Sequence, residues 1–119
     1  MASTRAAPFE IPGELVTDLR LCASGATVTV RGEVDVHTAS VLRERLAEVV
    51  SQGEARVVVF LDGVTFMDSV GLGVLVAAHK AQEACGGTLE IVCDEPRVLR
   101  VLHLTGLHRV LTIHEGRDG

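Results

Sequence analysis

The stretch that most constrains the fold of this chain is residues 56–76, RVVVFLDGVTFMDSVGLGVLV. It opens with five consecutive apolar residues at 57–61, the pattern of a short central strand that is buried on both faces of a sheet. After a brief loop, Asp68 and Ser69 stand directly before a run with helical spacing. Asp is favoured at a helix N-cap because its carboxylate accepts hydrogen bonds from the N–H groups of the first turn. The stretch therefore predicts a strand, a loop and a helix that begins at Ser69, with its hydroxyl near the positive end of the helix dipole.

Two glycines in the first turn of this helix are not explained by helix stability. Gly71 and Gly73 each cost about 1 kcal/mol of helix propensity relative to Ala. A glycine does permit another backbone, a nucleotide or a partner surface to approach closely. The turn is also apolar on nearly every side, since aliphatic residues surround the glycines: Val70, Leu72 and Val74. We interpret the part that its own sheet cannot bury as a contact surface centred on the Ser69 hydroxyl.

The rest of the chain alternates strands with helices after an initial hairpin. This order implies right-handed β-α-β crossovers and a largely parallel sheet, so the predicted class is α/β. Residues 1–13 are expected to form a loose tail, and 14–119 a single domain. The first helix is capped by Asp35 or Thr38, and the pattern does not decide between them. The other predicted elements are strands at 15–23, 27–31, 88–93 and 110–113, helices at about 39–52 and 69–85, and a helix from Pro96 towards Gly106.

The composition excludes several classes of protein. A net charge of −5 with a single lysine, and no Trp or Tyr, argues against nucleic-acid binding. No segment approaches the roughly 18 apolar residues of a membrane span, and we see no secretory signal, so we expect a cytoplasmic protein without membrane insertion. Three cysteines without a C-x-x-C pair suit a reducing cytosol. Cys22 and Cys93 fall in predicted strands and are expected to be core residues.

No cofactor or catalytic site is predicted. The Gly71-Leu72-Gly73 run is not a dinucleotide fingerprint, because Val76 occupies the third glycine position and the turn is too long. The five histidines show no metal-ligand spacing, although His103, His108 and His114 could gather in space. No base for Ser69 is identifiable, since nothing in the spacing requires His37 or His79 to approach it. We expect a protein that is not an enzyme and needs no cofactor; on spacing alone, Asp68-Ser69 is first a plain helix cap and only second a functional serine.

Two motifs resemble those of a known family. Residues 66–75, FMDSVGLGVL, closely resemble the phosphorylation motif of bacterial anti-sigma factor antagonists, which are single STAS domains. Gly32-Glu33-Val34-Asp35 with Thr38-Ala39 matches their second motif, and the order of elements agrees over about residues 14–114. The resemblance implies a STAS-like fold, with an initial β-hairpin, β-α repeats, a largely parallel sheet of about four or five strands and helices mainly on one face.

The resemblance also implies a function without catalysis. The unmodified protein binds an anti-sigma factor, usually a serine kinase, and frees a sigma factor to join RNA polymerase. The kinase, using its own ATP and Mg²⁺, phosphorylates the serine at the position of Ser69, and a protein serine phosphatase resets the switch. Many members carry a second serine where this chain has Val70, which leaves Ser69 as the clear acceptor and Thr65 as a weaker one. The expected partner-binding residues are Asp35, Asp68, Val70, Gly71, Leu72, Gly73 and Val74.

Phosphorylation is expected to act on the interface rather than on folding. A phosphate adds about −1.5 to −2 charges, and the N–H groups and dipole of a helix N-terminus tolerate an anion. Two other functions stay open: a STAS scaffold subunit of a transporter or sensory complex, and a small nucleotide-binding module that meets phosphates with its glycine-rich turn. One question about coverage also stays open. The 57–61 strand is apolar on both faces, so the hairpin, the tail or a partner would have to cover the face that lacks helices.

Overall fold

A single five-stranded sheet organises the domain in the computed structural model, which describes residues 15–115. The strands lie in the order β1-β2-β3-β4-β5, so β1 and β5 are the edges. The expected tail at 1–13 lies outside the described residues. The elements are β1 (Val16–Cys22), β2 (Gly25–Val34), α1 (Ala39–Ser51), β3 (Arg56–Met67), α2 (Ser69–Ala84), β4 (Thr88–Val92), α3 (Pro96–Leu104), the 3₁₀ helix η2 (Leu107–Arg109) and β5 (Thr112–His114).

The strand directions follow from the connections between them. The two-residue turn after Cys22 makes β1 and β2 an antiparallel hairpin, with Leu19 opposite Val28. The pairs β2–β3, β3–β4 and β4–β5 are parallel, because a helix or a longer helical connection separates the strands of each pair. The α/β class and the largely parallel sheet predicted from the element order are confirmed.

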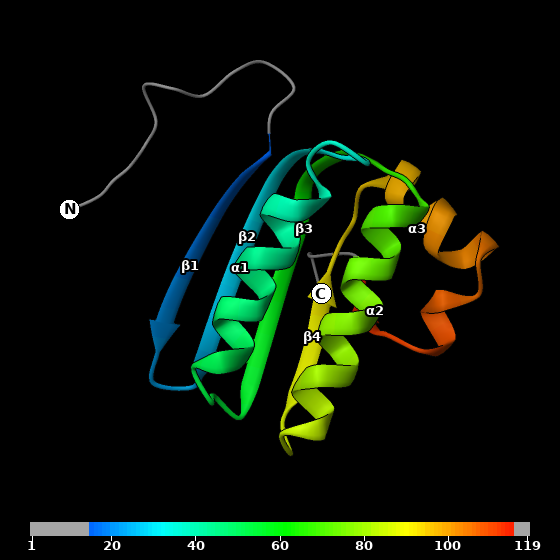
Figure 1. The fold of residues 1–119 in the computed structure, drawn as a ribbon. Coiled ribbons are helices and arrows are strands. Elements are labelled where there is room, and N and C mark those ends of the chain that lie inside the picture. The colour runs from blue at the N-terminus through cyan, green and yellow to red at the C-terminus, as the bar shows by residue number, and fades with distance from the viewer. Residues whose placement is uncertain (1–14, 116–119) are drawn as a thin grey trace.

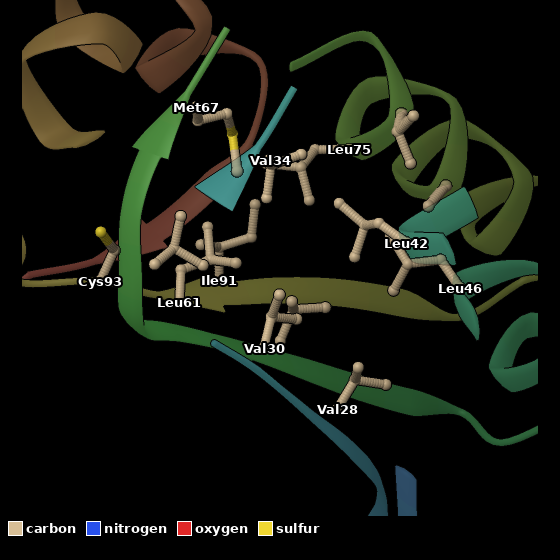
Figure 2. Close-up of a cluster of buried hydrophobic side chains, with 14 of the residues drawn as sticks. Val28, Val30, Val34, Leu42, Leu46, Leu61, Met67, Leu75, Ile91 and Cys93 are labelled. Atoms are coloured by element: carbon tan, nitrogen blue, oxygen red, sulfur yellow. The ribbon is translucent and has the colours of Figure 1, made fainter. Parts of the chain in front are cut away.

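Helices α1 and α2 lie side by side over one face of the sheet (Figure 1). Val57, Val59 and Leu61 of β3 alternate toward this face and are fully buried. The same layer receives strand residues such as Val28, Val30 and Ile91, and helix residues such as Leu42, Leu46 and Leu75 (Figure 2). Helix α3 packs against β3 and buries Val98 and Leu102. The core is therefore a layer of aliphatic side chains between the sheet and its helices.

Strand β3 is longer than the sequence suggests. The six residues 62–67, expected to be a loop, continue the strand to Met67. They pair with β2, Gly63 opposite Arg31 and Met67 opposite Val34, with irregular register between Thr29 and Arg31. Asp62-Gly63 resembles a turn, but here the glycine makes room for a side chain of β2. A Cβ on Gly63 would lie 2.5 Å from the Arg31 Cγ.

Two predictions about burial are wrong. Strand β3 is buried on one face only, since Val58 and Phe60, which alternate with the core residues, are half-buried on the face opposite α1 and α2. Cys22 is exposed, because β1 is an edge strand and its last residue lies at the hairpin turn. Cys93 is buried as predicted, and desolvation raises the pKa of its thiol to about 11. Strand position thus decided burial where the apolar pattern alone did not.

Candidate functional site

The two sequence motifs meet where β2 and β3 end. The Asp68 N–H donates to the carbonyl of Val34 at 3.1 Å, which ties the start of α2 to the last residue of β2. Asp35 follows Val34 directly and begins the turn into α1. Because both strands run in the same direction, their carboxyl ends lie at one edge of the sheet and the two carboxylates come to the same region.

Asp68 is the N-cap of α2, as predicted. Its backbone is extended, with φ −103° and ψ −173°. Its Oδ1 accepts hydrogen bonds from the N–H groups of Val70 at 3.0 Å and Gly71 at 3.2 Å. The Asp68 carbonyl accepts from Leu72 at 3.1 Å, the first bond of the helix ladder. Ser69 is therefore the first residue of α2, and its side chain is exposed.

This cap changes what the helix end offers to an anion. The N–H groups of Val70 and Gly71, expected to favour a phosphate, already donate to the Asp68 carboxylate. A phosphate on Ser69 would have to displace Asp68 to reach them, and the two anions repel each other. The first-turn N–H groups that we expected to tolerate an added anion are thus already engaged by the Asp68 cap. The start of α2 presents an exposed hydroxyl beside a fixed carboxylate.

Asp35 closes the turn between β2 and α1. Its Oδ1 accepts from the N–H groups of His37 at 2.9 Å and Thr38 at 3.1 Å. Thr38 occupies the N-cap position of α1 but makes no side-chain cap bond; its hydroxyl donates to the Glu33 carbonyl at 2.7 Å. Partial desolvation raises the pKa of Asp35, but the hydrogen bonds from Thr38 and His37 outweigh it and the net pKa is lowered. Asp35 is therefore ionised at neutral pH and held in a fixed turn.

Large apolar residues are exposed next to Ser69 in the chain and close to the ends of β2 and β3. Val70 is 37% exposed, Phe66 48% and Val36 65%, which is unusual for side chains of this size. Phe66 precedes the cap, and Val36 lies two residues after Val34, which the Asp68 N–H contacts. We call Val36, Phe66, Ser69 and Val70 the Ser69 surface. Neither Val36 nor Phe66 was predicted from the sequence as a surface residue; for Val36 the available signal was its position between Asp35 and His37, just after the end of β2.

Three of the expected partner-binding residues face the interior instead. Leu72 is 4% exposed, Val74 6%, and Gly71 is also buried. A Cβ on Gly71 would lie 2.5 Å from Cγ1 of Val34 and 3.0 Å from Cγ of Met67. Gly71 therefore serves close packing of α2 on its own sheet, not the approach of a partner. This corrects our interpretation of that glycine.

Gly73 behaves differently from Gly71. It is exposed, and a Cβ added there would have nothing within 4 Å. Internal packing thus gives no reason for a glycine at this position. Close approach of an external surface remains the proposed reason for a glycine here. Of the other expected partner-binding residues, Asp35, Asp68 and Val70 are partly or fully accessible.

The positions of the histidines and carboxylates bear on metal binding and catalysis. Between residues 15 and 115, no group of three or more His, Cys, Asp and Glu side chains could hold a metal ion. His79 is buried and lies 3.4 Å from Glu83, a residue on the same helix. His103 and His108 stack with ring centroids 4.3 Å apart, whereas His114 bonds to Glu90. No helix in the described part of the chain is long and apolar enough to cross a membrane.

Removing the cap should have a modest, local cost. We expect Asp68→Ala to lower the free energy of unfolding by about 1 kcal/mol, because the N–H groups of Val70 and Gly71 lose their acceptor. Urea denaturation followed by circular dichroism measures this. Asp18→Ala is the matched control, since Asp18 pairs with exposed Arg20 at a surface where ion pairs contribute little. Equal effects of the two substitutions would contradict the capping role.

Comparisons with known proteins agree on one family. A family model described as STAS domain matches residues 21–118. The anti-sigma-B factor antagonist of Bacillus subtilis is 35% identical over 102 residues, which cover 86% of this chain and 93% of that protein. The anti-sigma F factor antagonist of Paenibacillus polymyxa is 32% identical, over 74% of this chain and 76% of that protein. The crystal structure of an anti-sigma factor antagonist from Mycobacterium paratuberculosis superposes with a TM-score of 0.82 at 29% identity, covering 92% of this chain and 93% of that one.

Proposed function

This chain belongs to the STAS-domain family, with anti-sigma factor antagonists as its relatives, and we propose that it is itself such an antagonist, switched by phosphorylation of Ser69. Those relatives are regulatory binding proteins rather than enzymes. In the proposed cycle the unmodified chain binds an anti-sigma factor that is also a serine kinase, and a sigma factor is released. Phosphorylation ends the binding, and a protein serine phosphatase restores it.

The observation that carries this proposal is the setting of the Ser69 hydroxyl. It is exposed at the first position of α2, its neighbour Val70 is exposed, and so are Val36 and Phe66 close to the ends of β2 and β3. Apolar residues exposed together, with charged groups at their margin, are typical of a protein interface. Asp35 and Asp68 supply that charge, and both are held by hydrogen bonds to backbone N–H groups. A kinase that docks on this surface would have the acceptor hydroxyl within the contact.

The same setting explains how a phosphate would end the contact. It would bring about two negative charges next to Asp68, whose carboxylate already occupies the N–H groups of the first turn. In an apolar, desolvated contact these charges would lack water and counter-ions. The modified surface would therefore be disfavoured in the complex but harmless in the free protein, where water solvates the phosphate.

The relatives favour the antagonist function over the alternatives. The chain spans 93% of the Bacillus subtilis antagonist, so nearly the whole of that regulator is represented here. The scaffold function needs no acceptor hydroxyl at position 69. A nucleotide-binding module would need a glycine-rich turn that is open to phosphates. The space beside Gly71 is instead occupied by the side chains of Val34 and Met67. We propose a cytoplasmic site of action, where sigma factors and kinases with ATP operate.

Intact-mass spectrometry of the protein isolated from its own cells tests the proposal. We expect a fraction of molecules to carry one added phosphate, and the same preparation of Ser69→Ala to carry none. Among the described residues, Ser69 combines an exposed hydroxyl, the helix start and the apolar surround. A phosphate retained by Ser69→Ala would move the acceptor to another residue such as Thr65. If no phosphate is found under any growth condition, the proposed switch is contradicted and the scaffold function is the explanation that is left.

A further inference from the structure

The face of the sheet opposite α1 and α2 carries a second surface feature. Aligned residues of parallel neighbours share a face, and here Val58 lies beside Thr27 and Glu90, and Phe60 beside Val92. Val58 and Phe60 alternate with the buried Val57, Val59 and Leu61, so they belong to the face opposite the helices. The face is therefore partly apolar in its centre.

The strand sequence suggests that this face is normally covered. A strand with one solvated face alternates apolar and polar residues, whereas an unbroken apolar run is typical of a strand covered on both sides. Residues 57–61 form such a run, yet the helices cover only one side. Val58, Phe60 and Val92 are half-buried, and the residues that line this face with them come from the strands and the β1–β2 turn. An occupant of this face would remove their apolar surface from water.

A cavity lies over these residues. Its volume is about 370 Å³, and its lining comes entirely from the five strands and the turn between β1 and β2. Val58, Phe60 and Val92 supply apolar lining. The volume is near the lower end of the range of roughly 300–1,000 Å³ that small-molecule sites have. Its size suits a small ligand better than a folded partner.

An ion pair between Arg56 and Glu90 borders the cavity. The Arg56 guanidinium donates to Glu90 from Nε at 3.0 Å and from Nη2 at 3.1 Å, and His114 Nε2 lies 3.0 Å from the same carboxylate. The hydrogen bonds from Arg56, and then that from His114, hold the pKa of Glu90 below its usual value. Glu90 is thus ionised and engaged by both partners, while the Arg56 side chain is 52% exposed and its Nη1 makes no hydrogen bond to a described residue.

We propose that this cavity binds a small planar aromatic anion, with its ring on Val58, Phe60 and Val92 and its acidic group on the free side of Arg56. A flat ring suits a flat sheet surface and can pack on the Phe60 ring. With Nε and Nη2 engaged by Glu90, the guanidinium still offers the N–H groups of Nη1 to a carboxylate or sulfonate oxygen. His114 also lines the cavity, with its Nε2 bonded to Glu90. The site is separate from the Ser69 surface and does not depend on the proposed switch.

Titration with 8-anilinonaphthalene-1-sulfonate, an aromatic sulfonate, tests this directly. The chain has no Trp or Tyr, so probe emission is read without interference. We expect one saturable site per chain. Arg56→Gln should lower the affinity for the probe about tenfold, because one charge-assisted hydrogen bond is lost. Arg100→Gln, an exposed arginine on α3 outside the cavity, is the matched control and should leave the affinity unchanged. Ser69→Ala should also bind normally.

Two further measurements distinguish this cavity from binding elsewhere on the protein. The double variant Arg56→Gln/Glu90→Gln removes the cation without leaving an unpaired carboxylate, and it should also bind about tenfold more weakly. If Arg56→Gln does not fold, amide shifts of the unchanged protein decide the location. Shifts at 56–60 and 90–92 support the site. Shifts at Val36 and Phe66, abolished by Phe66→Ser, would overturn it.

Absence of saturable binding would also overturn the proposal. Sedimentation velocity would then show whether a second copy of the chain covers this face, as a dimer whose formation Val58→Asp prevents. A monomer that does not bind the probe would equally contradict an open aromatic-anion site at Arg56.

Discussion

A phosphate on Ser69 is expected to weaken binding to the anti-sigma factor by about 100-fold or more, while the free energy of unfolding changes by less than about 1 kcal/mol. The separation of the two effects follows from the geometry. Ser69 is exposed, so the phosphate displaces no core contact in the free protein. In the complex it would meet the Asp68 carboxylate and lose its water. Calorimetric binding and thermal denaturation of the two forms, prepared from one sample, measure both quantities.

Substitutions at the same position provide the controls. Ser69→Ala should bind the anti-sigma factor like the unmodified chain and should no longer respond to the kinase. Ser69→Asp should weaken binding less than the phosphate does, because it adds one charge instead of about two. Strong destabilisation of Ser69→Asp with unchanged affinity for the anti-sigma factor would contradict the interface explanation, because the switch would then act through folding.

Alanine at the two glycines of α2 should have opposite effects on stability. Gly71→Ala places a Cβ 2.5 Å from Cγ1 of Val34, a fully buried, β-branched residue that cannot easily move. We expect a net loss of about 1–3 kcal/mol, which exceeds the helix propensity that Ala regains. Gly73→Ala has nothing within 4 Å and should raise stability by up to about 1 kcal/mol. Urea denaturation of both variants gives the comparison.

The pair also tests the role of Gly73 at the interface. If a partner approaches closely there, Gly73→Ala should be the more stable protein and the poorer binder. Equal binding by Gly73→Ala and the unchanged chain would remove Gly73 from the proposed contact surface. A stable, well-packed Gly71→Ala would show that Val34 or Met67 can move aside, contrary to the packing in the structure.

The sequence alone located those features that depend on neighbouring residues. The start of α2 at Ser69 and the Asp68 cap were predictable, because the cap bonds reach only two and three residues along the chain. That residues 57–61 form a strand was visible for the same reason, whereas the alternation of buried Val57 and Val59 with half-buried Val58 was not. The α/β class followed from the order of these local patterns, and the resemblance of residues 66–75 to a family motif is what predicts Ser69 as the acceptor.

The tertiary structure decided whatever depends on residues far apart in the sequence. Gly71 is a packing residue because Val34, 37 positions earlier, lies against it. Strand β3 runs through Asp62-Gly63 because β2 supplies pairing partners and a side chain that needs the space. The exposure of Phe66 depends on where other elements end, and no local pattern encodes that. The sequence by itself thus determined the position of the Ser69 hydroxyl and of its helix cap, because short-range hydrogen bonds set both. Which residues are exposed near them was determined only by packing between segments that are distant in the sequence.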